Sequence, residues 1–88
     1  MSQRKKGGVP TTPRFHEDDH VVLKASVTGT NRLMKSGYMH HLPAGTKGII
    51  NSSKDGVSEV EFRVAGEHGF EDIIVMRVPE VKLDHDPG

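Results

Sequence analysis

The stretch KDGVSEVEFRV, residues 54–64, decides the fold class of this 88-residue chain. Most of it alternates apolar with charged residues, which is the period of a β-strand with one buried face and one wet face. Asp55 and Gly56, near its start, supply the positive φ that a tight hairpin turn requires. We therefore predict that residues 46–52 and 57–64 pair as antiparallel strands.

Three further segments have strand character, and no segment shows a helical stripe. Residues 21–27 alternate and are rich in β-branched residues, which favours a pleated, half-buried strand. Residues 70–78, the fourth strand, are apolar on both faces, which predicts a central or partly covered strand. After a 3₁₀-like turn at Pro79, residues 81–83 return as a short closing strand. The prediction is an all-β fold, a small barrel of about five antiparallel strands whose closure hides the sheet edges.

The chain is long enough for one small domain, because so short a chain buries only a thin core. We assign the barrel to residues 15–84. Basic and small residues dominate residues 1–14, so we expect a disordered basic tail there, and we expect residues 85–88 to fray. One connection is long, residues 28–45, and long connections in compact domains are often functional.

The composition excludes some chemistry and indicates a cellular location. The chain has no cysteine, which excludes disulfides, thiolate nucleophiles and Cys-ligated zinc. Its net charge is zero, but residues 1–35 hold seven basic and three acidic residues whereas residues 36–88 hold five and nine. This asymmetry indicates a basic arm on an acidic body. No apolar run reaches the ~20 residues of a membrane span, and the N-terminus lacks the apolar segment of a signal peptide, so we expect a cytoplasmic protein without membrane association.

Four segments carry a resemblance to a known family: Asp19–Leu23, Leu42–Ile50, Glu59–Phe62 and Ile73–Leu83. They are similar to a family of uncharacterised bacterial SH3-like barrel proteins, whose members share a D-x-V-x-L strand, an L-P-A-G-x-x-G-x-V turn and a V-E-F strand. Similar glycine patterns occur in KOW-type modules, in the small photosystem I accessory subunit and in the β-subunit barrel of nitrile hydratase. The resemblance covers residues 18–83. It implies an SH3-like fold and carries no activity.

The glycine-rich turn also has physical reasons of its own. Pro43 fixes φ for a turn, Gly45 can take a positive φ, and Gly48 lets a strand bend sharply or a neighbouring backbone approach closely. The corners of a small barrel require such positions. The residues and the resemblance therefore agree on the fold.

The segment HEDDH, residues 16–20, matches the H-E-x-x-H pattern of zinc proteases. That pattern works only when both histidines lie one turn apart on the same face of a helix, where they reach one zinc ion. Pro13 precedes the segment and a β-branched Val-Val pair follows it, so we interpret it as a charged approach to the first strand. No serine has the glycine-flanked setting of a nucleophile elbow. We therefore expect no enzyme, no catalytic residue, no metal and no cofactor.

Two adjacent histidines, His40 and His41, lie in the long connection. Adjacent side chains of an extended segment point apart, so these two do not easily share one ion, and we interpret them as solvent-exposed. Convergence of His16, His20 or His68 with one of them is the alternative, and it would create a weak transition-metal site.

Apolar residues favour a non-catalytic binding or accessory module that engages a protein partner. Alternation predicts that the outer face of the fourth strand exposes Ile73 and Val75, and Leu33 and the methionines of the long connection add adaptable apolar surface. The partner is unknown, and we expect a monomer or a weak homo-oligomer; folding of the connection over the strand within one molecule is the alternative. The candidate binding residues are Arg32, Met34, Lys35, Tyr38, Met39, His40, His41, Ile73 and Val75.

Nucleic-acid binding is the alternative function, because small β-barrels bind RNA or DNA by stacking bases on aromatic residues over a basic groove. The tail and the long connection supply the cations, which could neutralise phosphates without sequence preference. Aromatic residues are few, and we assign Phe15, Phe62 and Phe70 to the core. The candidate residues are Arg4, Lys5, Lys6, Arg14, Arg32, Lys35 and Tyr38.

Overall fold

The computed structural model of the protein describes residues 14–35, 37–66 and 69–87. The tail up to residue 13 lies outside these ranges, and so does His68. Within them the chain forms seven β-strands and one short 3₁₀ helix, and no α-helix. The elements are β1 His20–Leu23, β2 Val27–Thr30, β3 Met39–Leu42, β4 Lys47–Lys54, β5 Val57–Ala65, β6 Glu71–Pro79, η1 Glu80–Lys82 and β7 Leu83–His85.

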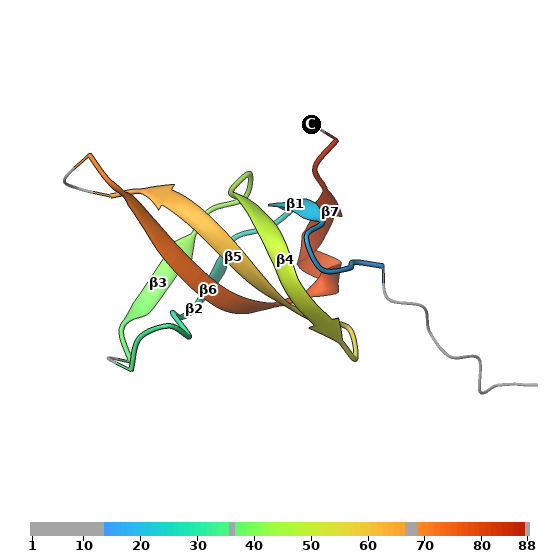
Figure 1. Ribbon diagram of the computed structural model, residues 1–88, viewed down its shortest axis with the longest axis horizontal. Coiled ribbons are helices and arrows are strands. Elements are labelled where there is room, and N and C mark those ends of the chain that lie inside the picture. Colours follow the sequence, from blue (N-terminus) through green and yellow to red (C-terminus); the bar gives the residue numbers. More distant parts are fainter. Residues whose placement is uncertain (1–13, 36, 67–68, 88) are drawn as a thin grey trace, which may run out of the picture.

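The strands form two antiparallel sheets, which confirms the all-β prediction. One sheet has five strands in the order β6-β5-β4-β1-β7, and the other is the hairpin β2-β3. Together they make a small, partly open SH3-like barrel, in which β2 contacts β6 from the opposite side (Figure 1). Each strand of the larger sheet corresponds to one of the five predicted strands, and η1 follows Pro79 as the predicted 3₁₀ turn does, but Val81, predicted to belong to the closing strand, lies in η1 and β7 begins only at Leu83.

The predicted hairpin is present between β4 and β5. Asp55 and Gly56 take φ values of 54° and 80°, as the tight turn requires. β5 then pairs with β6 along its whole length, from Val57 opposite Pro79 to Ala65 opposite Glu71. This ribbon is the longest pairing in the barrel, and β6, predicted as a central or partly covered strand, is the edge strand of the larger sheet (Figure 1).

The prediction of one strand over residues 21–27 is wrong, because the chain bends between two strands there. β1 ends at Leu23, and the Lys24 N–H donates to the Lys82 carbonyl at 2.8 Å instead of continuing the ladder. Val27 opens β2 in the other sheet, opposite Leu42. Leu23 and Val27 are both buried in the same core, whereas Ala25 between them is exposed, so the alternation of burial is interrupted at the bend.

The long connection, residues 28–45, is for the most part structured. β2 and β3 pair within it, from Val27 opposite Leu42 to Thr30 opposite Met39. What remains at its tip is residues 31–38, called the β2–β3 loop below.

Asn31 fixes the base of this loop to the free edge of β6. Its amide Nδ2 donates to the Ile73 carbonyl at 3.0 Å, and its Oδ1 accepts the backbone N–H groups of Val75 and Leu33, both at 3.0 Å. The Arg32 N–H donates to the Val75 carbonyl at 2.7 Å. Asn31 is only 6% exposed. The loop thereby satisfies backbone groups that an edge strand would otherwise present to solvent or to another chain.

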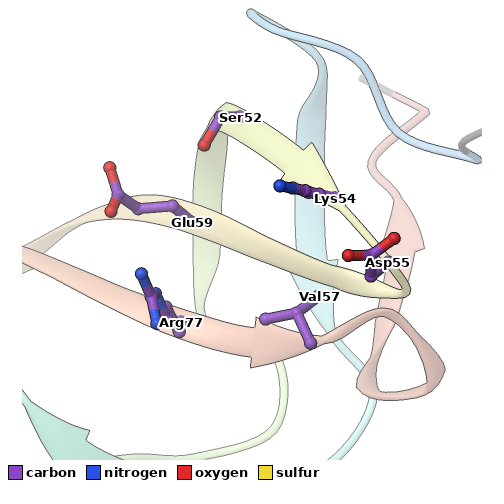
Figure 2. Close-up of a pocket in the computed structure, with 6 residues that line it drawn as sticks. All are labelled: Ser52, Lys54, Asp55, Val57, Glu59 and Arg77. Carbon is purple, nitrogen blue, oxygen red and sulfur yellow. The ribbon is translucent and has the colours of Figure 1, made fainter.

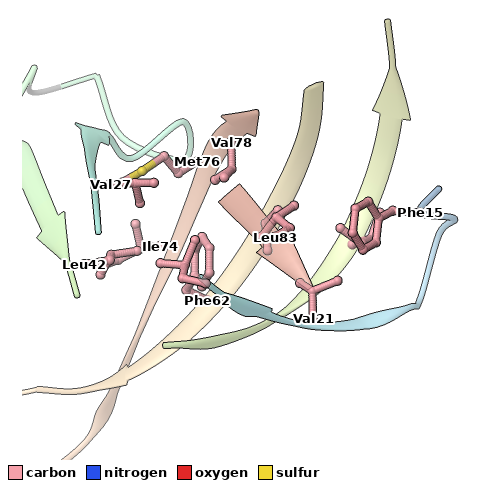
Figure 3. Close-up of a cluster of buried hydrophobic side chains, with 12 residues drawn as sticks. Phe15, Val21, Val27, Leu42, Phe62, Ile74, Met76, Val78 and Leu83 are labelled. Atoms are coloured by element: carbon pink, nitrogen blue, oxygen red, sulfur yellow. The ribbon is translucent and has the colours of Figure 1, made fainter. Parts of the chain in front are cut away.

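The core lies between the two sheets and collects the inward side chains of every strand (Figure 3). Phe15, ahead of β1, is fully buried, and its ring packs against His85 of β7 with 4.5 Å between the ring centroids. The Asp86 N–H donates to the His20 carbonyl, so backbone pairing continues past residue 84. The core members are Phe15, Val21, Leu23, Val27, Leu42, Ile50, Val60, Phe62, Ile74, Met76, Val78 and Leu83.

The assignment of Phe70 to the core is wrong, because its side chain is 77% exposed. It follows Gly69, whose φ of 76° belongs to the turn at the far tip of the β5–β6 ribbon. Residues 71–73, the start of β6, are exposed as well, so the described part of this end of the ribbon lies outside the core.

Two glycines, Gly45 in the turn before β4 and Gly48 near the start of β4, lie where a side chain would be strained or would clash, as the sequence predicts. Gly45 takes a φ of 93°, which a side chain would strain. Gly48 is buried, and a Cβ there would lie 2.7 Å from Val60 Cγ1 and 2.9 Å from Phe62 Cδ1. The packing of β4 onto β5 therefore depends on the missing side chain at Gly48.

We predict that Gly48→Ala lowers the free energy of unfolding by about 1–3 kcal/mol, because the added methyl overpacks the core against branched and aromatic neighbours. Gly29→Ala is the matched control: it is also a strand glycine, and its added Cβ meets mainly the flexible side chain of Met76, at 3.2 Å. Urea denaturation of both variants measures the difference. Equal effects of the two substitutions would contradict the account of this packing.

Candidate protein-binding surface

The segment HEDDH forms a tight turn followed by the start of β1, as a charged approach to the first strand. The His16 N–H donates to Asp19 Oδ2 at 2.9 Å, and the Asp19 N–H donates to the His16 carbonyl at 3.0 Å. Asp18 takes a φ of 72°, and His20 already belongs to β1. The two histidines thus lie on different elements rather than on one helical face. In the part of the chain that the structure describes, no group of three His, Asp or Glu side chains is placed to hold a metal ion.

The carboxylate of Asp19 is held by the backbone of this turn. The hydrogen bond from the His16 backbone lowers the pKa of Asp19; partial desolvation opposes the shift, and the charge of a protonated His85 adds to it. His85 Nε2 lies 3.5 Å from Asp19 Oδ2. The carboxylate therefore joins the turn before β1 to the last strand.

His40 and His41 sit on opposite faces of β3, as expected for adjacent residues of a strand. The exposed His41 shares a hydrogen bond of 2.9 Å between its Nδ1 and Thr28 Oγ1 of β2. His40 is half-buried and meets the Tyr38 ring edge-on, with 4.8 Å between centroids. Each imidazole thus has its own neighbour, and the two do not converge on one point.

The largest exposed apolar side chains of the hairpin gather in and beside the β2–β3 loop. Four of them are between 54% and 66% exposed, and Asn31 links this loop directly to Ile73 of β6, which is 43% exposed. We call this set the apolar loop surface: Leu33, Met34, Tyr38, Met39 and Ile73.

Val75 is not part of that surface, and its predicted exposure is wrong. Ile73 and Val75 occupy the same face of β6, but Val75 is only 4% exposed. Its backbone N–H and carbonyl bind Asn31 and Arg32, so the base of the loop lies over it. Strand alternation assigns a side chain to a face; it does not say what covers that face.

Among the predicted basic residues that the structure describes, Arg14 lies apart from Arg32 and Lys35, which share the β2–β3 loop. Arg32 Nε donates to Glu59 Oε1 at 3.1 Å, and Lys35 is exposed in the same loop. Arg14 instead lies over the Phe15 ring, 4.9 Å from its centroid, and 4.0 Å from Asp84 of β7. β7 and the β2–β3 loop lie at different sides of the molecule (Figure 1). Arg4, Lys5 and Lys6 fall outside the described residues.

A shallow groove on the outer face of the larger sheet has no counterpart among the sequence predictions. It has a volume of about 510 Å³, and Figure 2 shows its side chains rising from β4, β5 and β6. The lining residues are Ser52, Lys54, Asp55, Val57, Glu59 and Arg77.

A β-bulge creates this groove. The register of β4 against β5 shifts between Ile50 and Ser52, so that Ser52 pairs with Glu59 and Lys54 with Val57. By simple alternation Ser52 and Lys54 would share the inward face of Ile50; the extra residue turns them outward. Periodicity carries no signal for a bulge at this position.

Comparison with protein-family models, with curated proteins and with solved structures finds no match. Membership of the bacterial SH3-like family stays a prediction that rests on the sequence segments alone. Among the described residues, no helix has both the length and the apolar character needed to cross a membrane.

We predict that the contribution of Asp19 to stability is lost in acid. A folded-state pKa below the usual 3.8 means that this contribution is fully present above pH 3.8 and disappears as the pH falls through the folded-state pKa. Asp19→Asn should therefore destabilise the protein at about pH 6 and have little effect at about pH 2. Denaturation at both pH values tests this, with the exposed neighbour Glu17→Gln as the control. A penalty for Asp19→Asn that is the same at both values would contradict the assignment.

Proposed function

We propose that the protein is a cytoplasmic, non-catalytic binding module that engages a protein partner through the apolar loop surface. One observation carries this proposal: four large apolar side chains, each more than half exposed, lie in or at the end of one short loop. Apolar groups gathered in this way are typical of interaction sites, and a methionine pair with a tyrosine supplies adaptable contacts of the kind such sites use.

The anchoring of the loop supports the same proposal. Asn31 and Arg32 hold the loop base on β6 through three hydrogen bonds, and a fourth, from the Leu33 N–H to Asn31, lies within the loop. A loop fixed in this way loses less conformational entropy on binding than a free one, so more of the contact energy becomes affinity. Burial of one exposed leucine or methionine at an interface contributes about 1.5–3 kcal/mol.

The pairing of the carboxylates also favours a binding role over catalysis. Glu59 is paired with Arg32 and Glu61 with Arg63, both pairs on the outer face of β5. Acid-base catalysis by two carboxylates requires the two to be held in different environments, and both of these carboxylates are partly exposed and paired with an arginine.

Nucleic-acid binding through Arg32, Lys35 and Tyr38 is the second candidate. The edge-on pair of Tyr38 and His40 supports it, because an exposed aromatic platform beside a lysine suits a stacked base. The pairing of Arg32 with Glu59 weakens it, because that guanidinium is not available to a phosphate without breaking an ion pair. Retention on a random oligonucleotide that falls steeply with salt would favour this candidate, and no retention at low salt would exclude it.

We predict that Leu33→Ser combined with Met34→Ser removes partner binding while the fold remains, because both side chains point into solvent. The tagged protein and the variant are each used to capture proteins from native lysate, and the captured proteins are compared quantitatively. Val81→Ser is the matched control, since Val81 is an equally exposed apolar residue on η1, away from the loop.

The expected result is a set of partners that the parent protein and Val81→Ser retain and the double variant loses. Equal capture by all three proteins would remove the apolar loop surface as the binding site.

A further inference from the structure

The residues that line the outer groove include two cations, Lys54 and Arg77, and two carboxylates, Asp55 and Glu59, and Arg32 adds a further cation at Glu59 from outside the lining. Arg77 of β6 stands directly opposite Glu59 in the β5–β6 register, yet the Glu59 carboxylate is paired with Arg32. One carboxylate thus faces two guanidinium groups. Lys54 adds a third cation from β4, and Asp55 adds one carboxylate from the adjacent turn. Within the described ranges, neither Arg77 nor Lys54 has an ion-pair partner.

The geometry of the groove suits a short ligand with both an anionic and an apolar part. Lys54 and Arg77 stand on either side of β5, which presents the partly exposed Val57 beside Lys54 and Glu59 beside Arg77 (Figure 2). A carboxylate placed between the two cations would gain charge-assisted hydrogen bonds from both. An aliphatic neighbour of that carboxylate would rest on Val57.

We infer that this groove binds an acidic peptide segment, with a Glu or Asp carboxylate held between Lys54 and Arg77. The inference rests on the proposed function, because the segment belongs to a protein partner. Arg32 connects the two regions, since it comes from the β2–β3 loop and its side chain ends at Glu59 beside the groove. A partner that spans both regions presents apolar residues next to acidic ones.

The charges in the groove favour a peptide over a nucleic acid. Asp55 and Glu59 line the same depression as the cations. A peptide needs to bring only one carboxylate to Lys54 and Arg77, whereas a continuous phosphate backbone would bring several negative charges past both acidic groups.

The test is a titration of the isotope-labelled protein with an acetylated peptide of alternating leucine and glutamate, followed by nuclear magnetic resonance. The expected result is a shift of the Lys54, Val57 and Arg77 amide signals, with an affinity that falls as salt is added. Lys54→Glu with Arg77→Glu should weaken binding by about tenfold or more, the loss of at least one charge-assisted contact. Lys24→Glu, an exposed charge reversal outside the groove, should bind like the parent protein.

The milder pair Lys54→Gln with Arg77→Gln keeps the test valid if the charge reversals disturb folding, and it should weaken binding in the same direction. Peptide affinity that is unchanged in these variants, or absent in the parent protein, would overturn the inference. A single-stranded oligonucleotide that shifts the same amides at lower concentration would overturn it in favour of nucleic acid. The Leu33→Ser and Met34→Ser variant leaves the groove intact and should bind the peptide normally. Failure of the peptide to bind the parent protein would count against the groove, whereas retention of all lysate partners by this variant would count against the apolar loop surface.

Discussion

The buried side-chain amide of Asn31 is the interaction on which the architecture of the binding region depends. It donates to one backbone carbonyl of β6 and accepts two backbone N–H groups, one from β6 and one from its own loop. Only an amide has a donor and an acceptor in this arrangement; a carboxylate would lack the donor and an aliphatic residue would lack both. A buried backbone group left without its partner costs about 1–3 kcal/mol. The same residue therefore closes the edge of β6 and sets the position of the loop that we propose as the binding site.

Much of the fold can be predicted from the alternation of apolar and polar side chains along the strands and from the residues that form the turns. Alternation correctly places Val60 and Phe62 in the core, and Asp55 with Gly56 defines the hairpin turn, because both properties are local. The bend after Leu23 is not local: it accompanies pairing with segments far along the chain, and nothing in the sequence indicates that Ala25 is exposed there. For that reason the hairpin β2–β3 could not be read from the pattern.

The candidate site was predictable only in part, for the same physical reason. Sequence indicates that the long connection carries exposed apolar residues, and Met34, Tyr38 and Met39 are exposed. It could not indicate that Asn31 covers Val75, since that contact joins residues 44 apart in the chain. The outer groove depends on a bulge in β4, which shifts register without any change in composition. A net charge of zero likewise hides a local excess of cations, because charge is decided by which faces the strands share.

Hydrogen exchange at the Val75 backbone N–H tests the central role of Asn31 most directly. In the parent protein this amide donates to a buried side-chain oxygen, so it should exchange slowly, as core amides do. In Asn31→Ala, exchange at Val75 and Leu33 should become fast, while Val60 in the centre of the larger sheet stays protected. A Val75 amide that exchanges equally slowly with and without Asn31 would contradict the account, because it would mean that the edge of β6 is closed by something other than this side chain.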